Sequence, residues 1–406
     1  MFPSRRTKPG GLATGGGDVF RDEYSLAFDG TDDYVDCGSQ SDLDVGTSEF
    51  TVSAWVKFDD LTTAQNTIVA KGVGLTGIAG DGWWLGIYNG NQQLYFDMYT
   101  ATDARNNVLA SGALSTGIWY HIVATKETSG SDIVGSIYIN GKLKASSTFS
   151  GLASTPITDD GENFKIGAYS KDDNATTGYY LSGNISEVVQ YDTGLTASQV
   201  KTLYNGREPY NYKEGIVTAN LKGWWRMGDG DNDSFSNTTD TTADTTGLIQ
   251  DMATPITKTE LVTGWTNGTF STPPTISGLD ITDCISDGSG NDNLYSNAID
   301  MTAGDILEVF FTISGDTIPS SANELIFKLS EHNHLGSTQF DSSITGAGDY
   351  HFFATFTATD SSSYVGFRAS STAVDFDVRN FSCKKVAGGS NGIILNVGNN
   401  FEGDTP

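Results

Sequence analysis

The chain has 406 residues, of which 50 are acidic and 23 are Lys or Arg, so its formal net charge is −27 at pH 7. A chain this acidic repels phosphate backbones, which argues against nucleic-acid binding through a basic face. Its 21 Phe, 17 Tyr and 7 Trp argue against disorder, because that much aromatic surface is unfavourable in water. No apolar run approaches the length of about 18 residues that predicts a membrane span.

The acidic residues are mostly aspartates, with 38 Asp against 12 Glu. Aspartate favours turns because its short carboxylate accepts hydrogen bonds from nearby backbone N–H groups. Together with 48 Gly, this composition predicts many short strands joined by turns. Three cysteines cannot form a fully paired framework, and residues 1–12 contain no apolar signal-peptide segment. We therefore expect synthesis in a reducing cytoplasm.

Residues 1–23 form an extended N-terminal arm in this interpretation. Arg5, Arg6 and Lys8 are its early charges, no acid accompanies them, and a glycine-rich stretch follows. Such a segment has little preference for a fold of its own. A basic arm on an acidic body favours docking onto an acidic partner protein, and the alternative is an uninformative tail.

Residues 24–213 show the period-two alternation that is typical of half-buried strands. In residues 50–58 the even positions are apolar, and in residues 93–98 they are Leu94, Phe96 and Met98. Asn140-Gly141 predicts a tight hairpin because both residues tolerate positive φ. A helix is expected over residues 196–205, with Thr196 and Gln199 forming a capping box.

Residues 214–256 change character and are interpreted as a linker or junction, in which Trp224 and Trp225 fill the space between two domains. Residues 257–386 return to alternation, and residues 387–406 form a C-terminal tail. The fold class is therefore all-β, with two antiparallel β-sandwich (jelly-roll) domains behind the extended N-terminal arm.

Residues 24–213 contain a series of short segments whose order along the chain is informative. They are Tyr24–Asp36, Phe50–Trp55, Ile68–Lys71, Trp119–Ala124, Ile137–Gly141, Gly183–Val188 and Val200–Tyr204. Together they resemble the laminin-G-like branch of the concanavalin A-like lectin/glucanase superfamily. The family's usual Ile-Asp-Glu-Val is Ile-Ser-Glu-Val here, so Ser186 replaces a carboxylate that can support a structural cation.

Residues 221–230, 248–251 and 404–406 resemble the end of bacteriophage structural proteins, many of them marine, that carry this domain. In those proteins the tail follows directly, so the resemblance implies that residues 257–386 are an insertion. The insert resembles jelly-roll carbohydrate-binding modules. Its usual calcium-binding acids are Thr269 and Ser271 here, which implies that this site is absent.

No catalytic residues are expected, because glucanases of this fold carry a Glu-x-Asp-x-x-Glu run that the chain lacks. Sugar-binding candidates are aromatic residues in a Gly/Asn-rich hairpin region, with interface or core packing as the alternative. They are Trp83, Trp84, Tyr88, Tyr95 and Tyr99, and Tyr179 and Tyr180 are similar.

Calcium is a possible cofactor, because alternate carboxylates can wrap oxygen ligands around a hard cation. Asp229, Asp231 and Asp233 have that spacing, and an acidic turn is the alternative. A weaker candidate is the group Asp29, Asp32, Asp33 and Asp36. Cys284 and Cys383 lie near the first and last strands of the insert, where reduced thiols are favoured over a pair.

The resemblance implies a non-enzymatic bacteriophage virion protein, a head decoration or fibre-type component on the virion exterior and made in the host cytoplasm. Its partners would be other virion proteins, capsid or tail, bound through Arg5, Arg6 and Lys8, with neither nucleic acid nor membrane insertion. The alternative is a glycan-binding adhesin or receptor-binding protein that recognises host surface polysaccharide.

Overall fold

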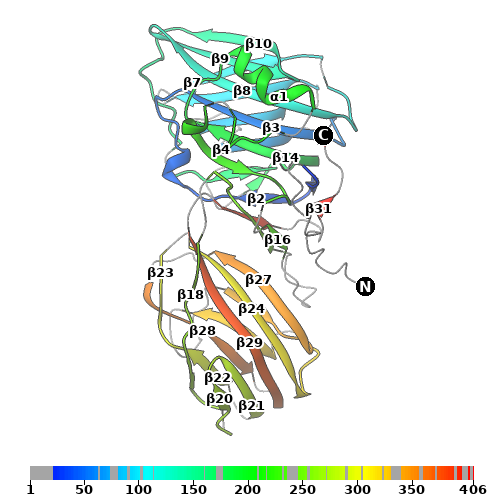
Figure 1. Cartoon of the computed structure of the whole chain (residues 1–406), viewed down its shortest axis with the longest axis vertical. Helices are drawn as coiled ribbons and strands as arrows, with labels where there is room; N and C mark the ends of the chain where they lie inside the picture. Colours follow the sequence, from blue (N-terminus) through cyan, green and yellow to red (C-terminus); the bar gives the residue numbers. More distant parts are fainter. Residues whose placement is uncertain are drawn as a thin grey trace, which may run out of the picture.

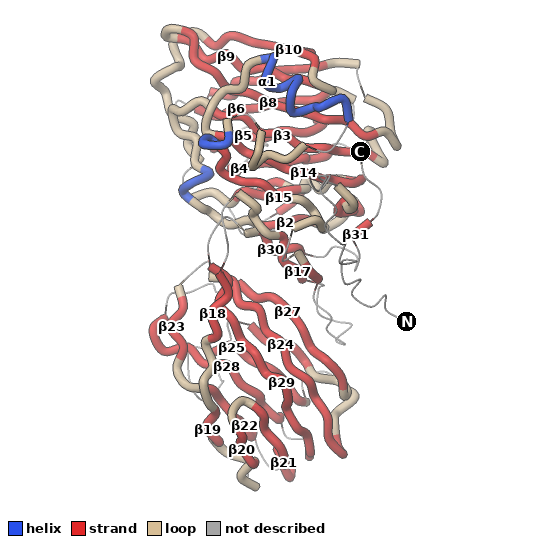
Figure 2. The backbone as a smooth tube through the Cα atoms, viewed as in Figure 1, coloured by secondary structure: helices blue, strands red, loops and turns tan. Residues whose placement is uncertain are grey.

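The structure is a computed structural model, and it describes residues 22–406 with internal gaps. The gaps are residues 63–64, 74–80, 89–91, 101–103, 113, 160, 171–176, 208–209, 216, 231–232, 236–245, 254–256, 271, 289–290, 303–304, 322–323, 331–339, 356–359, 371–372, 388–390, 396–400 and 403–405. Within the described residues the fold is all-β as predicted, with antiparallel sheets in sandwich-like domains (Figures 1 and 2).

Two sheets form the first sandwich. One runs in the order β10 (Lys142–Phe149), β9 (Asp132–Ile139), β8 (Trp119–Ser129), β3 (Phe50–Phe58), β14 (Ser182–Tyr191), β1 (Ser25–Asp29) and β31 (Phe401–Glu402), with β15 (Leu221–Trp225) also paired to β14. The other runs in the order β16 (Ser234–Phe235), β17 (Thr246–Ile249), β30 (Gly392–Leu395), β2 (Tyr34–Asp36), β11 (Phe164–Ile166), β4 (Gln65–Val73), β5 (Asp81–Tyr88), β6 (Leu94–Thr100) and β7 (Ala104–Ala110), with β12 (Tyr169–Ser170) and β13 (Thr177–Gly178) beside β4.

The second sandwich is built from residues 257–387 and lies below the first in Figure 1. One sheet runs in the order β20 (Thr275–Ser277), β21 (Asp280–Asp287), β29 (Ala373–Ala387), β24 (Ile306–Thr317) and β27 (Gly348–Thr355), with β18 (Thr257–Glu260) on β29. The other runs in the order β19 (Trp265–Asn267), β22 (Asn291–Ser296), β28 (Asp360–Ser370), β25 (Leu325–Ser330) and β26 (Phe340–Ser343), with β23 (Ile299–Met301) on β28.

Each sandwich buries its own hydrophobic core between its sheets. The predicted inward faces are confirmed in both, for Leu94, Phe96 and Met98 in the first and for Val309 and Phe311 in the second. Side chains alternate between the two faces of a strand, so the core takes every second residue. The remaining residues of each strand are then available for an outer surface.

Local sequence signals are also confirmed. The helix α1 (Ala197–Tyr204) begins after Thr196, whose side chain accepts a bond from the backbone of Gln199 and completes the capping box. Asn140 and Gly141 both have positive φ, 50° and 71°, as a type I′ hairpin between β9 and β10 requires. Short 3₁₀ turns occupy Ser41–Leu43, Asn205–Arg207 and Thr218–Asn220. None of the described helices is long and apolar enough to cross a membrane.

The segments interpreted as a junction and a tail contribute strands to the first sandwich. Residues 214–256 supply β15, β16 and β17, and residues 387–406 supply β30 and β31. Trp225 lies in the main core of the first sandwich and Trp224 packs against Tyr212 beside it, so the expectation that both fill a domain junction is wrong. β17 comes before the second sandwich in the sequence and β30 comes after it, yet the two strands pair with each other in the first sandwich. This is the arrangement expected if the second sandwich is inserted into the first.

The three cysteines are buried and unpaired. Cys284 lies on β21 opposite Phe376, and Cys383 lies on β29 opposite Val309. Burial raises the pKa of Cys284 to about 12, so this thiol stays protonated at neutral pH. The reduced state that the sequence favoured is the one in the structure.

Candidate functional site

The outer surface of β5 and β6 carries a group of aromatic side chains, here called the aromatic face. Because Leu94, Phe96 and Met98 point into the core, Tyr95 and Tyr99 lie on the opposite side of β6. The face consists of Trp84, Tyr88, Tyr95, Tyr99, Tyr169 and Tyr179. Its members come from β5, β6, β12 and the segment before β14, which the pairing of β4 with β5 and β12 brings together.

The rings of the aromatic face meet in edge-to-face and tilted pairs. Tyr88 and Tyr95 have centroids 5.5 Å apart at an interplanar angle of 68°, and Trp84 lies 6.4 and 6.5 Å from them. Arg105 of β7 lies over both tyrosines, with its guanidinium carbon 5.2 Å from the Tyr88 centroid and 6.0 Å from that of Tyr95. This cation–π arrangement fixes a positive charge on the face.

Asp97 lies between Tyr95 and Tyr99 on β6 and is fully buried. Its Oδ2 accepts hydrogen bonds from Nε and Nη2 of Arg105 at 3.1 and 2.7 Å. Burial raises the pKa of Asp97, although the ion pair with Arg105 opposes that rise. Its Oδ1 has no hydrogen-bond partner among the described residues. A buried carboxylate oxygen without a donor is costly, so Asp97 depends on Arg105 for its stabilisation.

Burial keeps the hydroxyls of Tyr99 and Tyr169 neutral, because it raises the pKa of both groups. Burial, followed by the negative charge of Asp97, raises the pKa of Tyr99 to about 12. The hydroxyl of Tyr169 is buried and also has no hydrogen-bond partner among the described residues. Asp97 and Tyr169 therefore each keep one unsatisfied polar atom in the buried part of the face.

Three of the five predicted sugar-binding residues are buried, which corrects the sequence expectation. Trp83 belongs to the core, where it packs on Phe50 and Phe164. Trp84 points outward but is 0% exposed, since its ring lies across Gly86 and its Nε1 donates to Thr67. Tyr99 is 5% exposed.

What remains open to solvent is a smaller surface than the sequence suggested. Tyr88 and Tyr95 are half-buried, Tyr179 is half-buried beside them, and Arg105 is exposed. The two buried aromatics Trp84 and Tyr99 support these residues from below. The structure thus brings the predicted tyrosines Tyr88 and Tyr95 together at the surface. The predicted tryptophans are buried, and Arg105 is the exposed residue beside the tyrosines.

Sequence reasoning missed Asp97, Arg105 and Tyr169. The signal for Asp97 was present, because positions 95, 97 and 99 share one face of a strand whose other face is apolar. The signal for Arg105 was weaker, since its pairing opposite Tyr99 depends on the register of β6 and β7. Tyr169 is brought to the face by a parallel pairing of β12 with β4, which no local pattern indicates.

Of the residues that were proposed for anchoring and for the first calcium candidate, the structure describes only Asp229 and Asp233. Arg5, Arg6, Lys8 and Asp231 lie outside the described residues. Asp229 accepts hydrogen bonds from the backbone N–H groups of residues 23 and 24, and Asp233 accepts from those of residues 228, 230 and 250. These two carboxylates therefore organise the backbone, which favours the acidic-turn alternative for them.

The weaker calcium candidate is partly assembled. Oxygen atoms of Asp29, Asp32 and Asp33 lie within 4.8 Å of one another. Asp33 accepts from the backbone N–H of Asp29, and Asp29 accepts from that of Thr31, as in an ordinary turn. Asp36 bonds the backbone of Gly38 and the side chain of Asn163 instead. Calcium binding at this turn stays a prediction.

Several solved structures are similar to parts of the chain. No curated protein sequence matches the chain. The chain is similar to a solved putative carbohydrate binding protein from Bacteroides ovatus, at 18% identity over 57% of this chain with a TM-score of 0.37, and it spans 56% of that protein. It is also similar to a heptameric SAP-like pentraxin from Limulus polyphemus, at 18% identity over 48% of this chain and 84% of that chain with a TM-score of 0.35.

A third similar structure is the Ruminococcus gnavus IT-sialidase CBM40, at 16% identity over 45% of this chain and 96% of that chain with a TM-score of 0.36. These values are too low to carry an argument about ligands. A family model, in contrast, matches the sequence directly. Residues 29–201 match the Laminin_G_3 model of the concanavalin A-like lectin/glucanases superfamily, which confirms the predicted resemblance for that part of the chain.

Proposed function

We propose that the protein is a non-enzymatic glycan-binding protein that holds a sugar chain on its aromatic face. The observation that carries the proposal is the half-buried Tyr88–Tyr95 pair under Arg105, whose guanidinium the buried Asp97 holds in place. Sugar-ring C–H groups pack on aromatic rings, and sugar hydroxyls need paired donors and acceptors. The face offers both in one place.

The charges on the face favour binding over hydrolysis. Glycoside hydrolysis needs one carboxyl that donates a proton and a second that acts as base or nucleophile across the same bond. Asp97 is held in an ion pair with Arg105, which fixes its orientation and opposes its protonation. A carboxylate in this state serves as a hydrogen-bond acceptor.

A glycan array that includes bacterial surface polysaccharides tests the proposal directly. We expect the wild-type protein to bind at least one glycan and Tyr95→Ala to weaken that binding by about tenfold, through loss of ring packing. The matched control is Tyr295→Ala, a half-buried tyrosine on the second sandwich, which should bind as the wild type does. An array without any bound glycan would contradict the proposal.

The bacteriophage virion role remains a second proposal, supported by the resemblance of residues 221–230, 248–251 and 404–406. Its anchoring residues lie outside the described residues, so the test must be functional. We expect deletion of residues 1–23 to abolish incorporation into particles while glycan binding persists. Normal incorporation of the truncated protein would exclude the arm as the anchor.

A further inference from the structure

A small pocket lies on the first sandwich away from the aromatic face, between β14 and the segments that follow α1. Its lining residues are Asp22, Trp55, Glu187, Arg207, Tyr210, Tyr212 and Pro406. Its cavity volume of about 20 Å³ admits one group the size of a water molecule. The pocket is therefore too small for a sugar ring.

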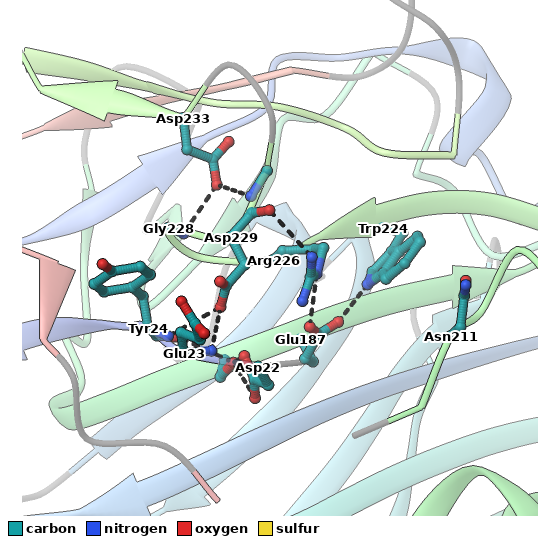
Figure 3. Close-up of polar contacts among 12 residues, drawn as sticks. Asp22, Glu23, Tyr24, Glu187, Asn211, Trp224, Arg226, Gly228, Asp229 and Asp233 are labelled. Atoms are coloured by element: carbon teal, nitrogen blue, oxygen red, sulfur yellow. Dashed lines mark hydrogen bonds and ion pairs between the residues drawn. The ribbon is translucent and has the colours of Figure 1, made fainter. Parts of the chain in front are cut away.

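Figure 3 shows the acidic side of this pocket. Glu187 sits at a β-bulge of β14 and accepts hydrogen bonds from Nε of Arg226, at 2.9 Å, and from Nε1 of Trp224. Asp22 accepts from the hydroxyl of Ser186, at 3.1 and 3.2 Å to its two oxygens. The family usually has an aspartate where this chain has Ser186. Asp22 therefore places a carboxylate next to that position from another part of the chain.

The acidic side chains around this pocket outnumber the buried positive charges beside them. Asp22, Glu187 and Asp229 act on one another, and the buried cation among them is Arg226. Arg207 also lines the pocket, but its side chain is exposed and its charge is screened by water. Burial and the neighbouring acids raise the pKa of Asp22 to about 9, and burial raises that of Glu187 to about 7.

The hydroxyl of Tyr212 gives an independent indication of a ligand. Tyr212 lines the pocket, is 1% exposed, and its hydroxyl has no hydrogen-bond partner among the described residues. Tyr212 and Glu187 line the same small pocket, and burial, followed by the charge of Glu187, raises the pKa of Tyr212. A buried hydroxyl beside carboxylates without a bond to them leaves an acceptor unused.

The charge, size and polar groups of the pocket indicate which kind of ligand it can bind. Three acidic side chains with one buried cation among them disfavour an anion, and a divalent metal is disfavoured because Arg226 already occupies an oxygen of Glu187. A group with one positive charge, three N–H donors and the size of a water molecule satisfies the pocket, and aromatic walls such as Trp55, Tyr210 and Tyr212 favour such a cation. We propose that the pocket binds the protonated amino group of a primary amine, with Asp22 as its charge partner and the Tyr212 hydroxyl as an acceptor.

Two sources share this chemistry, and titration calorimetry of the full chain separates them. The probes are Nα-acetyl-lysine amide for a lysine side chain, glucosamine for an amino sugar, and methylammonium for the bare group. Their N-acetylated forms are the neutral controls for the first two. We expect at least one amine to bind and its acetylated form to bind at least about tenfold more weakly, because a charge-assisted hydrogen bond is lost.

Two conservative variants test the assigned residues. We expect Asp22→Asn to weaken amine binding by about tenfold or more, and Tyr212→Phe to weaken it by a smaller factor of about three to ten. Asp192→Asn, which removes a surface carboxylate paired with Lys222, is the matched control and should bind normally. A thermal melt of each variant confirms that it is folded, so a loss of binding reports on the pocket.

The pH dependence of amine binding adds a readout that a structural role would not produce. Affinity should rise as pH increases through about 7 toward about 9, where Glu187 and Asp22 ionise in the empty pocket. It should fall above about 10 as the amine loses its proton. Folded protein that binds none of the three amines would overturn the proposal, and so would tighter binding of calcium alone that Asp22→Asn abolishes.

Discussion

Each sandwich carries a half-buried tyrosine pair with edge-to-face geometry on an outer sheet surface. In the first, Tyr88 and Tyr95 have centroids 5.5 Å apart at 68°, and in the second, Tyr295 and Tyr364 are 5.8 Å apart at 90°. The pairs differ in what lies beside them. The first has the buried Asp97 with Arg105 over both rings, whereas the strand position next to Tyr295 on the same face is the buried amide Asn293.

From this difference we expect that a half-buried ring pair does not by itself make a binding site. Rings contribute contact area, whereas fixed polar groups select a ligand and its orientation. Arg105 lies over both rings of the Tyr88–Tyr95 pair and is held by the buried Asp97, and the Tyr295–Tyr364 pair, beside the Asn293 amide, serves as the internal comparison for ring packing without that ion pair.

The largest expected effect is on the stability of the second sandwich alone. Phe311 is fully buried and packs on Phe327, Tyr350 and Phe367 in the second core. We expect Phe311→Ala to lower the free energy of unfolding of that sandwich by about 3–5 kcal/mol, through lost burial and the cavity that remains. Calorimetry should show this in one transition, with glycan binding retained.

Loss of glycan binding by Phe311→Ala at a temperature where the first sandwich is folded would break the comparison. It would mean that the second sandwich contributes to the site. The wild-type titration at the same temperature is the control, and Tyr350→Phe is a milder variant of the same core.

A smaller effect is expected at the ion pair of the aromatic face. Arg105→Ala leaves Asp97 buried without its cation and should lower stability by about 1–3 kcal/mol at neutral pH, discounted because the Arg105 side chain is 34% exposed. It should also weaken glycan binding by about tenfold or more, since a charged hydrogen-bond donor is removed.

The stability defect of Arg105→Ala should depend on pH in a defined direction. Asp97 already has a raised pKa in the folded state, and the loss of Arg105 raises it further. The folded variant then takes up a proton at a pH where the unfolded chain does not, so the defect is complete at neutral pH and shrinks as pH falls toward about 4. Denaturant unfolding at several pH values measures this, and a defect that grows in acid would contradict it.

The smallest effect concerns the helix of the first sandwich. Thr196→Ala removes the side chain that caps α1, and we expect a loss of about 1 kcal/mol. The matched substitution Thr202→Ala lies on the same helix outside the cap and should cost less. If Thr196→Ala shifted the unfolding of the second sandwich instead, the two sandwiches would be energetically coupled.

Much of the fold was predictable because its signals are local. Alternation identified the inward faces, and Asn140-Gly141 and Thr196 identified a hairpin and a helix start from a few residues each. The roles of β15 and β30 were not predictable in this way. β30 pairs with β17 and β2, which are distant in sequence, and β15 pairs with the preceding strand β14 across the intervening helix α1. Trp225 reaches the first core through that pairing of β15.

The candidate site was predictable in part for a related reason. The side of β6 that carries Tyr95 follows from alternation, but exposure does not. Trp84 and Tyr95 lie on the same outer surface, yet Trp84 is covered because Gly86 lets its ring lie across the strand. The ion pair of Asp97 with Arg105 depends on the register of a hairpin whose turn is not encoded by a strong signal.

The most direct test of the account is calorimetric titration of the strongest array glycan against two double variants. One is Tyr88→Ala with Tyr95→Ala on the first sandwich, and the other is Tyr295→Ala with Tyr364→Ala on the second. The account predicts that the first double variant loses binding by about a hundredfold or more while the second binds as the wild type does. Binding that survives in the first double variant and disappears in the second would contradict it.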